Sequence, residues 1–222
     1  MINKIKKYIK DLKLYNDSIS NIHREGTLLN SFLRNKIIFI HVPKTAGVSI
    51  IRSLFGDVTL ESHRNIQFYQ KIFRKDFENY FTFSFVRNPW DRLYSSYMFL
   101  KKGGLNLHDK NAFLMYLSSF KSFEDFVLHG LDDKILEEII HFVPQHKFLC
   151  DNQDNILVNY LGRFENLDQD VKKISSIINR NIILEYNNVN KKLHYKDVYN
   201  SSMIKKVQEV YCRDIEIFEY DF

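Results

Sequence analysis

The sequence contains few of the residues that cross-link a chain or interrupt its regular structure. Among 222 residues there are two cysteines, three prolines and seven glycines. The cysteines, Cys150 and Cys212, form no CxxC pair, which excludes a disulfide framework. We expect both thiols to be reduced and the protein to be cytoplasmic. The low glycine and proline content excludes a collagenous or low-complexity chain.

Long hydrophobic runs are also missing. No stretch of about 18 apolar residues occurs, so we expect no segment to span a membrane. The basic, amphipathic start of the chain lacks the apolar centre of a secretory signal. We expect residues 1–35 to form a helical extension that packs on the domain, with peripheral contact to a membrane surface as the alternative. Residues 36–222 are expected to form a single domain.

Apolar and aromatic side chains are plentiful. The chain is 45% hydrophobic and has 19 phenylalanines and 13 tyrosines, enough to build a sizeable core. The net charge of +5 suits an anionic ligand or a polyanionic substrate as well as a nucleic acid. The basic residues are scattered, however, and no aromatic RNA-binding signature is present. We therefore expect no nucleic-acid partner.

Apolar runs alternate with segments of helical spacing. The runs predict buried strands at residues 37–42, 80–86 and 156–164. Helices are predicted at residues 48–55, after Asn88 and Pro89, over most of 110–142, after Asn166, and from 203 to about 218 with Ser201 or Ser202 as the cap. Strands that alternate with helices predict an α/β domain with a central parallel sheet flanked by helices.

The junction between the first strand and its helix is the strongest indication of a ligand site. Residues 41–49 read HVPKTAGVS. A helix N-terminus presents unpaired N–H groups to an anion, Gly47 lets the backbone approach it, and Lys44 adds a full positive charge. The hydroxyl groups of Thr45 and Ser49 are further donors. The predicted phosphate site comprises Lys44, Thr45, Ala46, Gly47, Val48 and Ser49.

This loop differs from the usual nucleotide-hydrolase pattern. Its lysine precedes the glycine, no glycine stands upstream, and no apolar run ending in aspartate follows. An ordinary magnesium-nucleotide hydrolase is therefore disfavoured. No pair of carboxylates in a DxD arrangement and no Cys/His cluster with zinc spacing occurs, so we expect no metal site.

A second anion-binding pattern follows the second predicted strand. Residues 85–97 read FVRNPWDRLYSSY. Arg87 lies at the carboxyl end of the strand, where open α/β sheets bind ligands, and Ser95 lies about two turns into the next helix. Arg87 can bind a phosphate through two hydrogen bonds, and Ser95 can donate to the same group. If the two strands are neighbours, Lys44 and Arg87 flank one crevice, which suits a ligand with two separated phosphates.

These two segments together resemble the nucleotide-binding motifs of sulfotransferases. The segment 41–49 is similar to their 5′-phosphosulfate loop, and 85–97 is similar to their 3′-phosphate strand and helix. The similarity is closest to carbohydrate sulfotransferases of the heparan 2-O type and their bacterial relatives, and it continues at residues 142–149, 161–171 and 210–222. Val48 departs from the family loop, which usually has a hydroxyl-bearing residue there.

The resemblance implies a fold and an activity. The fold would be the P-loop NTPase-like sulfotransferase fold. The protein would transfer a sulfuryl group from PAPS (3′-phosphoadenosine-5′-phosphosulfate) to a hydroxyl of a saccharide acceptor and release PAP. A nucleotide-dependent kinase and a non-catalytic PAPS-binding module are the alternatives.

The resemblance also implies roles for single residues. Lys44 would neutralise charge on the leaving phosphate, while Arg87 and Ser95 would hold the 3′-phosphate. Arg163, at the end of the third predicted strand, is a further nucleotide-binding candidate, with a salt bridge to Glu165 as the alternative.

A histidine is the expected general base. His63, in the segment LESHRNI, would take the proton of the acceptor hydroxyl, because its unperturbed pKa of about 6.5 suits that task. Glu61 is the nearest alternative, and His141 and His146 are more distant ones.

Overall fold

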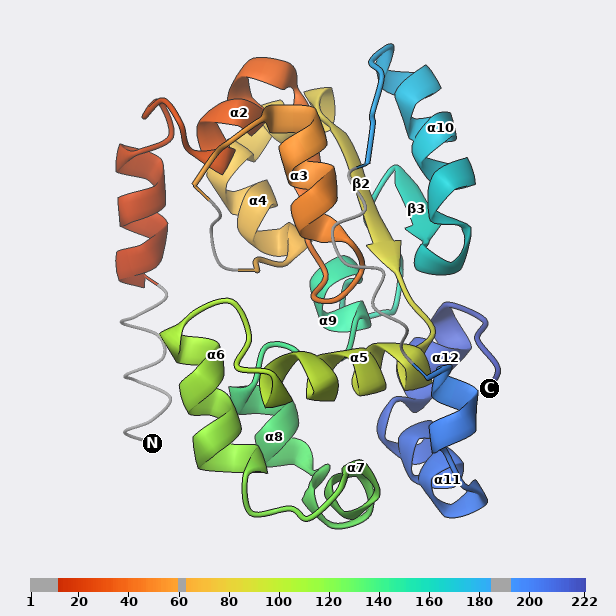
Figure 1. The fold of residues 1–222 in the computed structure, drawn as a ribbon. Coiled ribbons are helices and arrows are strands. Elements are labelled where there is room, and N and C mark those ends of the chain that lie inside the picture. Colours follow the sequence, from red (N-terminus) through yellow and green to blue (C-terminus); the bar gives the residue numbers. More distant parts are fainter. Residues whose placement is uncertain (1–11, 60–62, 185–192) are drawn as a thin grey trace.

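A computed structural model of the protein describes residues 12–59, 63–184 and 193–222. Its centre is a sheet of three parallel strands in the order β1, β2, β3, with bounds Ile37–Ile40, Phe81–Val86 and Tyr160–Arg163 (Figure 1). The three strands lie where the apolar runs predicted them and are shorter than predicted. The α/β fold class, with a parallel sheet flanked by helices, is therefore confirmed.

Strand register brings the carboxyl ends of the strands to one edge of the sheet. Ile40 pairs with Ser84, and Val86 pairs with Arg163. The loop after β1 and the residue after β2 consequently leave the sheet side by side. The strands are parallel neighbours in chain order, which requires the crossover connections seen between them.

Four helices cover the sheet, three from the first half of the chain and one from the second. Figure 1 shows α2, α3 and α4 grouped together beside the sheet, and α10 lies next to β3. Their bounds are Leu28–Asn35, Gly47–Phe55, Ile66–Phe73 and Leu167–Ile178. Because both faces of β1 are covered, all four of its residues are apolar and buried.

A second, purely helical core lies below the sheet and is organised by α5 (Pro89–Lys101). As predicted, α5 begins at Asn88, whose side chain accepts a hydrogen bond from Trp90 N–H, with Pro89 as the first residue. The other helices of this part are α6 (Leu107–Ala112), α7 (Phe123–Asp125), α8 (Asp133–Glu138), α11 (Ser201–Val210) and α12 (Cys212–Ile217). Helix α9 (His146–Leu149) instead contributes Phe148 and Leu149 to the core around the sheet.

Short 3-10 and π segments lie between the regular elements of both parts. The 3-10 turns span Arg74–Asn79, Phe164–Asn166 and Tyr195–Val198. The region 110–142 is mostly helical, as predicted, but π turns at Phe113–Leu117 and Phe126–Gly130 interrupt it.

The predicted C-terminal helix was wrong in two respects. Its cap is Asn200, whose side chain accepts from Met203 N–H at 3.0 Å, and neither of the two serines that follow. The helix also ends near Tyr211, which is buried and donates its hydroxyl to Phe142 O at 2.7 Å. Asparagine is as good a cap as serine, and the tyrosine contact comes from a distant segment, so local sequence does not show either feature.

The chain ahead of α2 packs beside α4. Residues 12–20 are helical, and Tyr15 Oη accepts from Arg74 Nη2 at 3.3 Å and lies 3.4 Å from Lys71 O. The boundary expected between residues 35 and 36 stays a prediction. None of the helices in the described part of the chain is long and apolar enough to cross a bilayer.

Candidate active site

The loop between β1 and α3 has an unusual backbone. Lys44 and Ala46 have φ values of 70° and 65°, in the left-handed region that costs non-glycine residues on the order of 1–3 kcal/mol each. Between them Thr45 is fully buried, and its hydroxyl donates to Val42 O at 2.9 Å. We expected this hydroxyl to face a ligand. It instead closes the turn, because a buried hydroxyl needs an acceptor and the nearby carbonyl supplies one.

The first turn of α3 is open to an anion. Its N-cap, Ala46, makes no side-chain hydrogen bond, so it leaves the first N–H groups of the helix without a side-chain acceptor. Gly47 is required there, because a Cβ at this position would lie 1.9 Å from His41 Cδ2. Val48 and Ser49 are half-buried, and within the described chain the Ser49 hydroxyl makes no hydrogen bond. Such a helix start, with its positive dipole end, suits a phosphate.

An aromatic ring positions the lysine of the loop. The Lys44 ammonium lies 3.8 Å from the centroid of Phe99, a residue of α5. Contact with the negative face of a ring stabilises a cation and limits the directions in which it extends. Phe99 was not among the predicted site residues, because it belongs to the helix of the second motif and contacts Lys44 only in the folded chain.

Arg87 joins the two predicted motifs. Its guanidinium donates through Nε to Asp91 Oδ2 at 2.7 Å and through Nη1 to Lys44 O at 3.0 Å. It also lies 4.0 Å from the centroid of Phe164, and its side chain is 11% exposed. The two basic segments therefore meet at the carboxyl edge of the sheet, as the sequence predicted. Two of the five N–H groups of Arg87 are used in this way, so three are left for a ligand.

A buried amide fixes the backbone of Arg87. Gln145 accepts from Arg87 N–H at 2.9 Å and donates to Arg87 O at 2.8 Å. Asp214, which is completely buried, accepts from the N–H groups of Gln145 and His146 at 2.7 and 2.9 Å. The segments 142–149 and 210–222 thus support Arg87. The sequence indicated that these segments matter but not what they do.

The other two nucleotide candidates lie in different surroundings. Ser95 is 4% exposed, and within the described residues its hydroxyl has no hydrogen-bond partner. Arg163 turns towards the C-terminal segment, where it donates to Phe218 O at 2.6 Å and lies 4.6 Å from the ring centroid of Tyr220. The alternative salt bridge from Arg163 to Glu165 is wrong. Glu165 accepts instead from Asn88 N–H and the Tyr220 hydroxyl.

His63 is held in one tautomer. Its Nδ1 lies 2.8 Å from His41 O, and a carbonyl oxygen only accepts, so Nδ1 carries the proton and Nε2 has a free lone pair. Burial lowers the pKa of His63 to about 4, partly offset by this hydrogen bond. Near neutral pH the ring is therefore uncharged and able to accept a proton at Nε2. Glu61, the alternative base, lies outside the described residues.

Two further histidines lie close to His63. The ring centroids of His63 and His41 are 4.2 Å apart, and those of His63 and His141 are 6.2 Å apart. Burial lowers the pKa of His41 well below its usual value. His141 Nε2 lies 3.1 Å from Asp109 Oδ1, while its Nδ1 is buried without a partner in the described part of the chain. Burial would raise the pKa of Asp109, but hydrogen bonds from His141 and Leu105 N–H outweigh it and lower that pKa.

The third histidine considered from the sequence lies apart from this cluster. His146 Nδ1 bonds at 2.6 Å to Asp214, the same residue that holds the backbone of Gln145. Asp109 was missed from the sequence, because no motif connects it to His141, which lies 32 residues away. Across residues 12–59, 63–184 and 193–222, no group of three His, Cys, Asp or Glu side chains is placed to hold a metal ion.

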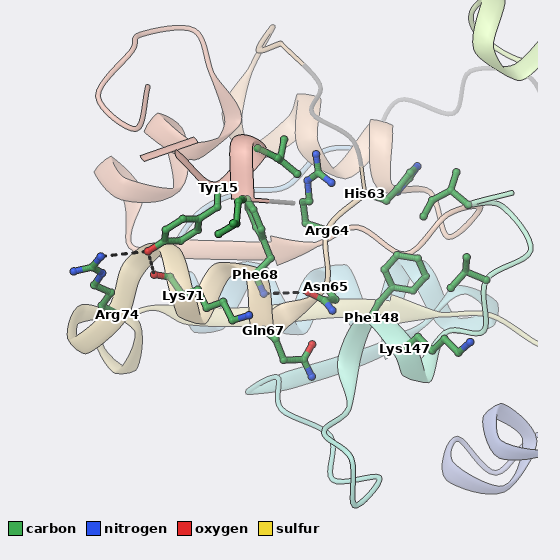
Figure 2. A pocket seen from close by; sticks show the side chains of 14 residues that line it. Tyr15, His63, Arg64, Asn65, Gln67, Phe68, Lys71, Arg74, Lys147 and Phe148 are labelled. Atoms are coloured by element: carbon green, nitrogen blue, oxygen red, sulfur yellow. Dashed lines mark hydrogen bonds between the residues drawn. The ribbon is translucent and has the colours of Figure 1, made fainter. Parts of the chain in front are cut away.

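A pocket of about 840 Å³ begins at His63 and extends away from the loop (Figure 2). Phe68 and Lys71 of α4 line it, together with Lys147 and Phe148 of α9. Tyr15 lies at the end distant from His63 (Figure 2). The expected base therefore lies between the predicted anion-binding loop and a cavity large enough for a small molecule.

Comparison with known proteins agrees with this site. A family model described as the sulfotransferase family matches residues 31–221, a range that includes both predicted anion-binding motifs and the segments that support Arg87. The chain belongs to the sulfotransferase family. The family predicted from the two motifs is thus confirmed, and this sulfotransferase acts in sulfuryl transfer to an acceptor.

Similarity to a known relative does not indicate which acceptor is used. An uncharacterized protein of Archaeoglobus fulgidus is 30% identical to the sulfotransferase over 104 residues, which are 47% of this chain and 72% of that protein. No solved structure matches the chain.

Proposed function

We propose that this sulfotransferase uses PAPS as its donor and transfers the sulfuryl group to a hydroxyl of a carbohydrate, releasing PAP. The observation that carries the proposal is the hydrogen bond from Arg87 to Lys44 O. It joins two anion-binding elements at one edge of the sheet, and PAPS has two phosphate groups, one at each end of its ribose.

The residues present fit this donor. The uncapped start of α3 and Lys44 would bind the 5′-phosphate, with the unbonded Ser49 hydroxyl as a further donor. The three remaining N–H groups of Arg87 and the Ser95 hydroxyl would bind the 3′-phosphate. Thr45, Ala46, Gly47 and Val48 would contribute through their backbone. Arg163 is held against the C-terminal segment and would have to leave Phe218 O to reach the nucleotide, so we assign it no direct contact.

Lys44 and His63 would be the catalytic residues. In the transfer, the acceptor oxygen bonds to sulfur while the bond from sulfur to the 5′-phosphate oxygen breaks. Lys44 would neutralise the charge that develops on that leaving oxygen. His63 would take the acceptor proton on Nε2, which the hydrogen bond to His41 O keeps unprotonated. Positioning and charge stabilisation are sufficient for this type of transfer, so we expect no metal to be needed.

A carbohydrate acceptor is supported by the motifs that resemble carbohydrate sulfotransferases and by the pocket at His63. The aromatic side chains of Tyr15, Phe68 and Phe148 line that pocket. The C–H faces of a sugar ring pack well on such side chains, while its hydroxyls remain free for His63.

Calorimetry tests the donor directly. We expect PAP to bind at least about tenfold more tightly than 5′-AMP, because only PAP engages Arg87 through a charge-assisted hydrogen bond. Equal affinities would refute the 3′-phosphate site. Turnover with PAPS should continue in EDTA. Activity that uses ATP and requires Mg²⁺ would make the protein a kinase, and PAP binding without turnover of any saccharide would make it a non-catalytic binding module.

A further inference from the structure

The pocket that begins at His63 has a strongly one-sided charge. Its lining includes Arg64, Lys71, Arg74 and Lys147. Within the described residues it includes no aspartate or glutamate. Four cations around one cavity of about 840 Å³ favour a ligand with an acidic group, since the fields of like charges on one side of a cavity add and attract an anion.

The same pocket has a substantial apolar wall. Phe68 and Phe148 line it, and the Arg64 guanidinium lies 5.3 Å from the ring centroid of Phe68. Leu12, which also lines the pocket, is 43% exposed, so part of this wall faces solvent. Covering it with an apolar group would remove that surface from water.

Part of the wall comes from the chain that precedes the family domain. Leu12, Leu14 and Tyr15 lie before residue 31, where the match to the sulfotransferase family begins. Tyr15 accepts a hydrogen bond from Arg74 Nη2 at 3.3 Å and lies 3.4 Å from Lys71 O. Figure 2 shows this phenol at the end of the pocket away from His63, in contact with both basic residues.

We propose that this pocket is the acceptor site, that it takes an acidic saccharide carrying an apolar group, and that Tyr15 determines this specificity by holding Arg74 in place. The inference rests on the proposed function, because it takes His63 as the base. With the reacting hydroxyl at His63, the rest of the acceptor extends towards Tyr15. The acidic group then lies among the basic residues and the apolar group against Phe68 and the N-terminal wall.

Binding of three chosen probes tests the ligand class. Calorimetry in the presence of saturating PAP would compare phenyl β-D-glucuronide with phenyl β-D-glucoside, which lacks the acid, and with methyl β-D-glucuronide, which lacks the ring. We expect the phenyl glucuronide to bind at least about tenfold more tightly than either, because omitting the acid or the ring weakens binding by about 1.4 kcal/mol or more.

Variants test the residues. Lys71→Ala and Tyr15→Ala should each weaken phenyl glucuronide by about fivefold to tenfold and leave PAP affinity unchanged. Tyr15→Phe keeps the ring and removes only the hydroxyl that Arg74 contacts, so it should weaken the phenyl glucuronide while binding of the glucoside stays the same. Lys75→Ala is the matched control, because Lys75 is exposed beside Arg74 but does not line the pocket.

The outcomes separate this inference from the proposed function. If PAP binds and the glucuronide binds no better than the glucoside, or if Tyr15→Phe changes nothing, the acceptor inference is wrong and the donor proposal stands. If the glucuronide binds as expected but PAP does not, the donor proposal fails and the pocket remains a site for acidic ligands. Thermal unfolding of each variant shows whether a loss of affinity reflects a loss of folded protein.

Discussion

The guanidinium of Arg87 donates a hydrogen bond to the backbone carbonyl oxygen of Lys44, across 43 residues of chain and a distance of 3.0 Å. This contact makes one site from two motifs that the sequence keeps apart. Behind it, Gln145 holds the backbone of Arg87, and Asp214 holds the backbone of Gln145. A change in the C-terminal segment can therefore affect Arg87, and with it the proposed nucleotide site, without direct contact.

Arg87 should distinguish PAP from 5′-AMP. We expect Arg87→Ala to weaken PAP by at least about tenfold, because a charge-assisted hydrogen bond contributes roughly 1.5–3 kcal/mol. Its effect on 5′-AMP should be much smaller. Calorimetry with both nucleotides measures this, and Arg213→Ala is the control, because Arg213 is exposed and pairs with Asp154. An equal loss for both nucleotides would mean that Arg87 supports the loop and does not bind the 3′-phosphate.

Gln145 should act on the nucleotide only through Arg87. Gln145→Leu leaves the N–H and carbonyl of Arg87 without their buried partners, which typically costs about 1–3 kcal/mol per group. We expect a lower melting temperature and a smaller preference for PAP over 5′-AMP. Gln67→Leu is the control, since Gln67 donates to Cys150 O and has no contact with Arg87. An unchanged preference in a destabilised Gln145 variant would limit Gln145 to a structural role.

The strands and the meeting of the two basic motifs could be predicted because their signals are local. A continuous run of buried apolar residues predicts β1, and the two basic motifs lie at strand ends where a parallel sheet brings them together. The roles of single residues within the loop were harder to predict. Thr45 and Ser49 look alike in the sequence, and only the fold shows that one hydroxyl closes the turn while the other does not.

The histidine cluster and the contacts of Gln145 and Asp214 that fix Arg87 could not be predicted, because they join distant segments. His63 and His41 are 22 residues apart, Asp109 and His141 are 32 apart, and no periodic pattern connects either pair. The last helix is divided at Tyr211, and the contact of this residue with Phe142 O also joins distant segments and is not visible in the local sequence.

Lys44 should matter more for turnover than for nucleotide binding. Lys44→Met retains most of the side-chain length and removes the charge, so the developing negative charge on the leaving phosphate loses its counter-charge. We expect kcat to fall by about 10²-fold or more, while PAP affinity falls by about tenfold or less. Lys44→Arg should retain little of the kcat, because a planar guanidinium replaces the compact charge of the ammonium.

Steady-state kinetics and PAP calorimetry on the same samples test this split. Lys101→Met is the matched control, since its ammonium also lies over a ring of α5, that of Tyr97, at 5.8 Å. If kcat and PAP affinity fall by the same factor, Lys44 only anchors the nucleotide.

The buried histidines should make stability depend on pH. In the unfolded chain both histidines have a pKa of about 6.5, whereas burial lowers the pKa of His63 to about 4 in the folded protein and also lowers that of His41. Between these values the unfolded chain binds more protons. The free energy of unfolding is therefore highest above pH 6.5 and falls as the pH drops towards 4, by about 3 kcal/mol for His63.

Urea unfolding at pH 7.5, 6.0 and 5.0 measures this dependence. His63→Gln should flatten it, and His23→Gln, which changes an exposed histidine, should not. Carboxyl groups whose pKa is lowered in the folded protein, such as that of Asp170, affect the free energy of unfolding only at lower pH. The dependence between pH 7.5 and 5.0 should therefore come from the histidines. A flat profile in the unmodified protein would contradict the burial of charge-free imidazoles.

His63 should be the base, and its lowered pKa makes the prediction specific. As the acceptor oxygen bonds to sulfur, its proton becomes strongly acidic, so even a base with a pKa of about 4 can take it. His63→Ala should lower kcat by about 10²–10⁴-fold and leave PAP affinity intact. In the unmodified enzyme kcat/KM should decline only as the pH approaches 4, because His63 stays unprotonated above that value. An ordinary histidine would give a decline near pH 6.5. Glu61→Gln is the companion variant: if it abolishes turnover while His63→Ala leaves turnover near normal, the base is Glu61.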